Sequence, residues 1–259
     1  MRILSKLIFH AFFPIMMFRN MYQMDIGDIS NLNFVFFSII TLLILIGISF
    51  LIVPRLVSEN EKRGVIIQGI YRTNIMLFAV ALVDNIYGAE GTAFVTVLTG
   101  FVIPIYNVVA VLILEYYHGE STSFPSLIKS AVTNPLIVGI ATGFIVHILG
   151  ITIPEMIAKP VFKYGEIVTP LAMFALGGTL HFSAVKTNAK YLIPVLSAKL
   201  VIIPLIVFVI ATWFGFVHIE RFVILTMFAT PSSTTSYTMA LTMGGDDELA
   251  GQFVVFSSA

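Results

Sequence analysis

Long apolar segments separated by short polar connections make up almost the whole of this 259-residue chain. Most of the first eight segments reach the roughly 20 residues that a bilayer-spanning helix needs, whereas the ninth is too short. Runs such as LVIIPLIVFVI do not alternate as barrel strands do, and backbone in lipid must satisfy its own hydrogen bonds. The pattern therefore predicts an all-α polytopic membrane protein with eight full spans and a partial ninth. The approximate limits are 3–24, 33–54, 64–87, 92–116, 132–157, 165–182, 191–216, 222–243 and 249–259.

Composition supports a lipid environment for most of the chain. Hydrophobic residues make up 58% and charged residues 11%, whereas a soluble domain has about 25% charged residues. The net charge is zero, so nothing indicates a nucleic-acid partner. There is no cysteine, and the five histidines show no ligand spacing, so we expect neither a metal site nor a cofactor. Nucleophile, phosphate-loop and zinc-protease motifs are absent, so the sequence predicts no enzyme.

Lysine and arginine are unevenly divided between the two ends of the segments, and cytoplasmic loops are normally enriched in both. More lysines and arginines lie on the side of the membrane from which the chain enters the first segment. We therefore expect a multi-pass protein of the cytoplasmic membrane whose first segment begins at the cytoplasm. The residues on that side are Arg2, Lys6, Arg55, Lys62, Arg63, Lys129, Lys186 and Lys190, and those on the other are Arg19, Lys159, Lys163 and Arg221.

Two parts of the chain resemble each other in the same order. Pro14-Ile-Met-Met-Phe18 resembles Pro170-Leu-Ala-Met-Phe174, and the same offset aligns 71–74 with 227–230. Five segments separate the members of each pair, so the copies would be inverted in the membrane, as in many secondary transporters. Chance similarity between apolar helices is the alternative. The repeat predicts a first repeat at 1–116, a cytoplasmic loop at 117–131 and a second repeat at 132–259.

The repeat also predicts a longer parent protein. The fifth segment has no partner, and the partner of the fourth stops unfinished at Ala259. We therefore expect a truncated version of a protein with two five-helix halves, lacking the first helix and most of the tenth. A genuine nine-segment design is the alternative.

The third segment places a charge deep in the membrane. Arg72 and Asn74 lie about ten residues into it, or roughly 15 Å at 1.5 Å per residue. An intramembrane arginine must face a polar interior, so Arg72 is a candidate for binding a substrate carboxylate, with Asn74 beside it. An arginine paired structurally with a carbonyl or carboxylate is the alternative.

The eighth segment contains the polar stretch TPSSTTSYT at the matching depth. Pro231 removes one backbone donor, so we expect the helix to kink or unwind there. Neighbouring hydroxyls could satisfy the freed carbonyls or bind a ligand. Because two interrupted helices at corresponding places in inverted halves indicate a midplane site, we expect the ligand-binding role. The candidate residues are Thr230, Pro231, Ser232, Ser233, Thr234 and Thr235.

Weaker candidates lie elsewhere. Asn134, before Pro135, is either a further substrate-binding residue or the start of a helix. Gly177-Gly178 would allow two helices to approach closely, which is ordinary packing.

Lys199 and Asp84 are the candidates for ion coupling. Lys199 is either a second intramembrane cation or a side chain that snorkels to the interface, and we favour snorkelling. Asp84 could transfer a proton but lies near the end of its segment, where we expect it to be hydrated. Glu166 is expected to be hydrated for the same reason.

These motifs resemble the auxin efflux carrier family, and most closely its bacterial members often labelled malate or malonate permeases. The resemblance covers nearly the whole chain. One departure concerns the first half, where many members of the family have a glycine and then a proline shortly after the asparagine that matches Asn74. Here Ile75–Val80 contains neither, which leaves open whether the third segment unwinds or bends around Arg72. The matching motifs are Pro14-x-x-x-Phe18, Tyr71-Arg-Thr-Asn74, Asn134-Pro-Leu-Ile137, Pro170-Leu-Ala-Met-Phe-Ala-Leu-Gly-Gly-Thr-Leu180 and Thr230-Pro-Ser-Ser.

The resemblance implies an inverted five-helix-repeat transporter fold, like that of bile-acid symporters and sodium–proton antiporters. Its fourth and ninth helices are broken where they cross, and Asn74 and Pro231 match the crossover residues. The implied function is secondary active transport of small organic anions by alternating access. A truncated, non-transporting remnant or sensor with the same fold is the alternative. The coupling ion, a proton or sodium, and a homodimeric assembly are left open.

Overall fold

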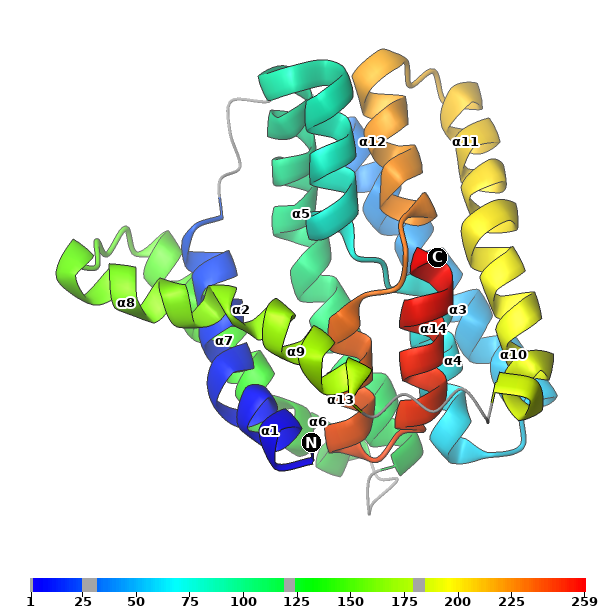
Figure 1. Cartoon of the computed structure of the whole chain (residues 1–259). Coiled ribbons are helices and arrows are strands. Elements are labelled where there is room, and N and C mark those ends of the chain that lie inside the picture. The colour runs from blue at the N-terminus through cyan, green and yellow to red at the C-terminus, as the bar shows by residue number, and fades with distance from the viewer. Residues whose placement is uncertain (1, 25–31, 119–123, 179–184) are drawn as a thin grey trace.

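The computed structural model describes residues 2–24, 32–118, 124–178 and 185–259, and almost all of them are helical (Figure 1). Among these residues, three π-helical turns, labelled η, continue directly into α-helices. The elements are α1 (Arg2–Leu7), η1 (Ile8–Phe12), α2 (Phe13–Tyr22), α3 (Asn33–Leu56), α4 (Asn60–Tyr71), η2 (Ile75–Ala79), α5 (Val80–His118), α6 (Phe124–Thr133), α7 (Pro135–Ile148), α8 (Glu155–Glu166), α9 (Val168–Gly177), α10 (Val185–Ser197), η4 (Ala198–Ile202), α11 (Ile203–Trp213), α12 (His218–Ala229), α13 (Thr234–Met243) and α14 (Asp247–Ser258).

The all-helical, membrane-spanning class predicted from the sequence is confirmed. In the described part of the chain, three helical stretches are long and apolar enough to cross a bilayer: Asn33–Leu56, Ile75–His118 and Val185–Trp213. α6 and α7 add a fourth if the pair, bent by 67°, counts as one span. The larger number of spans and the inverted repeat stay predictions, because other expected segments are divided into shorter helices.

Several expected boundaries shift. The expected span at 132–157 ends at Ile148, and Gly150 adopts a positive φ of 64° in the turn that follows. The described residues of the expected loop, 117–118 and 124–131, belong to α5 and α6. Its residues 119–123, and the end of the FALGGTL stretch at 179–180, lie outside the described residues.

Close packing of α2 against α7 depends on two glycines that face α2. A Cβ atom added to Gly139 would lie 2.4 Å from the carbonyl oxygen of Pro14, and one added to Gly143 would lie 2.4 Å from that of Phe18. The two helices therefore touch through their backbones. For Gly177, an added Cβ would meet nothing within 4 Å among the described residues, so this part of the structure gives no support to the close packing that the sequence suggested there.

Two interrupted helices meet in the interior. α4 ends at Tyr71 and η2 begins at Ile75, while α12 ends at Ala229 and α13 begins at Thr234. The non-helical residues between them pair: Thr73 and Ser232 form an antiparallel bridge, and the Asn74 N–H donates to the Pro231 carbonyl at 2.8 Å.

The third segment therefore unwinds rather than bends. Arg72 is extended (φ −86°, ψ 120°) although no proline or glycine follows it. An unpaired buried peptide group is costly, so the pairing with residues 231–232 makes the opened backbone acceptable. We call residues 72–74 and 230–233 together the crossing.

Candidate functional site

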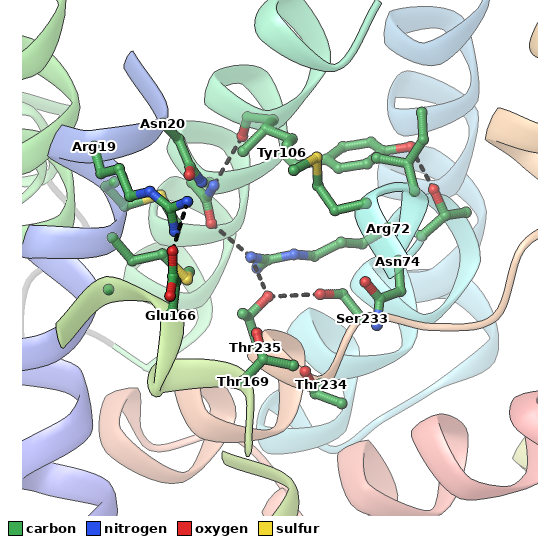
Figure 2. A pocket seen from close by; sticks show the side chains of 18 residues that line it. Arg19, Asn20, Arg72, Asn74, Tyr106, Glu166, Thr169, Ser233, Thr234 and Thr235 are labelled. Carbon is green, nitrogen blue, oxygen red and sulfur yellow. Dashed lines mark hydrogen bonds and ion pairs between the residues drawn. The ribbon is translucent and has the colours of Figure 1, made fainter. Parts of the chain in front are cut away.

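A cavity of about 280 Å³ lies against the crossing (Figure 2). α2 and the junction of α8 and α9 form one side of it, and the crossing and α5 form the other. Its lining combines hydroxyl, amide and charged groups with apolar side chains. The lining residues are Met16, Met17, Arg19, Asn20, Arg72, Thr73, Asn74, Ile75, Met76, Ile103, Tyr106, Asn107, Gly165, Glu166, Thr169, Ser233, Thr234 and Thr235.

Arg72 is the most deeply buried charge in this lining, at 2% exposure. Its Nη2 donates to Asn107 Oδ1 at 2.6 Å and to Thr235 Oγ1 at 2.7 Å. Its Nη1 donates to Gln68 Oε1 at 3.2 Å and contacts Met239 Sδ at 2.8 Å. All of these partners are neutral. The guanidinium is thus held in place, yet no carboxylate of the described residues neutralises it.

The hydroxyl-rich stretch divides between two surroundings. Ser233, Thr234 and Thr235 line the cavity at the start of α13, and the hydroxyls of Ser233 and Thr235 lie 2.7 Å apart (Figure 2). Ser233 precedes α13 but makes no side-chain capping bond. The first turn of α13 therefore presents hydroxyls and the positive end of the helix dipole to the cavity.

The other members of the stretch stabilise the crossing itself. Thr230 and Ser232 are buried and do not line the cavity. The Ser232 N–H donates to Ser257 Oγ at 2.9 Å, and the Pro231 carbonyl accepts from Asn74. Asn74 itself lines the cavity, as expected.

An ion pair on the opposite side of the cavity was missed from the sequence. Arg19 Nη2 and Glu166 Oε1 lie 3.1 Å apart and connect α2 to the end of α8 (Figure 2). The sequence placed Arg19 near the end of the first segment and Glu166 at a hydrated position, and the Glu166 side chain is indeed 59% exposed although it is paired. The sequence feature that could have pointed to Arg19 and Glu166 is that each lies a few residues from one of the repeated motifs at Pro14 and Pro170.

Two polar residues of α5 were also missed. Asn107 accepts from Arg72, and its Nδ2 donates to the carbonyl of Ile103 at 2.8 Å. The Tyr106 hydroxyl lies 2.9 Å from Thr73 Oγ1. An amide in the middle of an apolar segment was the signal that could have found Asn107.

Besides residues 230–232, three more predicted residues do not line this cavity. Asn134 caps α7, since its Oδ1 accepts from the Leu136 N–H at 3.0 Å, as the helix-start alternative proposed. Asp84 is exposed and accepts from Thr92 Oγ1 at 2.8 Å. Lys199 is fully buried, and its Nζ donates to the backbone carbonyl of Arg72 at 2.9 Å. The favoured snorkelling of Lys199 is therefore wrong, because its side chain is fully buried and its ammonium group bonds a backbone carbonyl.

A polar cavity where two broken helices meet inside an all-helical membrane protein is the arrangement of a membrane transporter. The family model described as "Membrane transport protein" matches residues 1–259. The chain therefore belongs to this family, the auxin efflux carrier family, as its motifs indicated. Among curated proteins, none matches the sequence.

Proposed function

We propose that the protein is a secondary active transporter that moves small organic anions across the cytoplasmic membrane by alternating access. The anions are carboxylates such as malate, malonate or auxin-like acids. The observation that supports this most directly is the buried Arg72 guanidinium, which faces the cavity and has only neutral partners.

A buried charge is costly unless an opposite charge compensates it. No aspartate or glutamate among the described residues is fully buried. A substrate carboxylate that enters the cavity would supply this missing charge and accept from the Arg72 fork. The positive end of α13 and the hydroxyls of Ser233 and Thr234 would add to the attraction.

The charge and volume of the cavity favour a small acid. Its charged lining residues are Arg19, Arg72 and Glu166, two positive and one negative, which leaves a formal charge of +1. Its volume, about 280 Å³, lies just below the range of about 300–1,000 Å³ that is usual for ligand pockets.

Alternating access would use the crossing. Residues 72–74 and 230–233 meet through one antiparallel bridge with its backbone hydrogen bond, and the side chains of Arg72 and Thr73 add bonds to Thr235 and Met227. The half-helices on either side are therefore joined by short non-helical backbone rather than by continuous helix. Half-helices of this kind gate access in other transporters by rocking or elevator-like movement around a fixed site.

Uptake of labelled dicarboxylates and indole acids into proteoliposomes tests the proposal. Arg72→Gln should reduce uptake by about 10- to 100-fold, since hydrogen bonds to charged groups contribute about 1.5–3 kcal/mol. Arg72→Lys keeps the charge without the fork and should retain an intermediate rate.

The matched control is Arg55→Gln. Arg55 is exposed at the end of α3 and bonds the Leu51 carbonyl, away from the cavity. Size-exclusion profiles of both variants would show that they remain folded. Unchanged anion uptake by folded Arg72→Gln would refute the carboxylate assignment. Absence of uptake by the wild type, with anion binding retained, would favour a sensor.

A further inference from the structure

Lys199 is a second buried cation that the proposed site does not use. It has 0% exposure and lies in η4, which packs against α10, α11, α12 and α4. It does not line the cavity, although its ammonium group bonds the backbone of Arg72, which does. Within the described part of the chain, no carboxylate lies within ion-pair distance of it.

The acceptor for Lys199 is the backbone carbonyl at the end of α4. Arg72 directly follows α4 as its C-cap residue, and its carbonyl oxygen accepts from Lys199 Nζ at 2.9 Å. The last carbonyls of a helix lack intrahelical partners and form the negative end of the helix dipole. In transporters with broken helices, such ends are where coupling cations bind.

The end of α12, the other helix that stops at the crossing, receives a different donor. The Met227 carbonyl, in the last turn of α12, accepts from the Thr73 hydroxyl at 2.8 Å. The repeat offset would place the counterpart of Lys199 at position 43, where the residue is Leu43. A full positive charge is therefore present at the end of α4, whereas the end of α12 receives a neutral donor.

We infer that the end of α4 is a monovalent-cation site that the chain fills with its own ammonium group, and that Lys199 is thereby a positioning residue for Arg72. Lys199 fixes the backbone of the residue whose side chain faces the cavity. A shift of the Arg72 carbonyl would move the guanidinium away from Asn107 and Thr235. The transport readout of this inference rests on the proposed function, but the site itself does not.

Chemical rescue distinguishes a charge from a packing role. Lys199→Ala removes the atoms that correspond to one propylammonium ion, so added propylammonium could occupy the vacated space. We expect this variant to bind the anion at least about tenfold more weakly, measured as KM for uptake, because a buried acceptor loses a charged donor. Propylammonium should restore KM, whereas 1-propanol, of similar shape without the charge, should not.

Melting temperature tests the site without transport. Propylammonium should raise the melting temperature of Lys199→Ala and leave the wild type unchanged. Lys186→Ala, which removes an exposed lysine of α10, is the matched control and should respond to neither additive. Lys199→Met, which keeps most of the side-chain volume, should show the same rise in KM.

The outcomes separate the two proposals. If no protein takes up anions while propylammonium still stabilises Lys199→Ala, the transport proposal fails and the cation site stands. Equal rescue by 1-propanol, or a wild-type KM in Lys199→Met, overturns the role of Lys199. If Lys199→Ala does not fold in the presence of either additive and Lys199→Met is fully active, the role of Lys199 is overturned as well.

Discussion

Gly139 provides the sharpest test of how the wall of the cavity is built. An alanine Cβ at this position would lie 2.4 Å from the Pro14 carbonyl oxygen, whereas ordinary contacts begin at 3.4 Å. α2 would have to move away from α7 by about 1 Å. Overpacking of this kind costs roughly 1–3 kcal/mol.

The displacement should affect both stability and the cavity. A loss of that size predicts a melting temperature lower by roughly 2–10 °C in a chain of this length. Because α2 also contains Arg19, the 3.1 Å ion pair with Glu166 should lengthen, and anion uptake should change with it.

Thermal unfolding in detergent, followed by tryptophan fluorescence, measures the effect. Gly47→Ala is the matched control, since Gly47 lies inside α3 and an added Cβ meets nothing within 4 Å. That variant should melt at or above the wild-type temperature, because alanine favours helix by about 1 kcal/mol. If Gly139→Ala melts as high as Gly47→Ala, the backbone contact between α2 and α7 does not exist.

Two further substitutions test the site residues directly. Asn107→Leu removes one acceptor of Arg72 Nη2 and should lower anion uptake by about tenfold or more. The control Asn85→Leu, on the exposed surface of α5, should not lower it. Equal uptake by both variants would contradict a role for the Arg72–Asn107 hydrogen bond. Asn134→Ala should lower the free energy of unfolding by about 0.5–2 kcal/mol through loss of the α7 cap and leave the KM for anion uptake unchanged. A raised KM would instead support the hypothesis that Asn134 binds the substrate.

The site was only partly predictable from the sequence. Arg72 and the hydroxyls of residues 233–235 were recognisable because polar groups in the middle of apolar segments are expensive and need a reason. Arg19 and Glu166 were not, since each lies near a segment end where charges are common. Only the packing of α2 against the junction of α8 and α9 brings them to the cavity.

The class of the protein followed from the sequence alone. Segment length is set by bilayer thickness and low charge by the absence of water, so local composition determined an all-helical membrane protein. Motifs at fixed spacing also determined the family. Pro231 likewise marked one break, because proline acts on the turn that contains it.

Only the tertiary structure decided the rest. The break at residues 72–74 has no local cause and exists because Asn74 and Thr73 find partners in residues 231–232. The burial of Lys199 depends on the Arg72 carbonyl, 127 residues away in sequence. Both features place polar groups where lipid would penalise them, and both are stable because a distant segment supplies the matching hydrogen-bond partner.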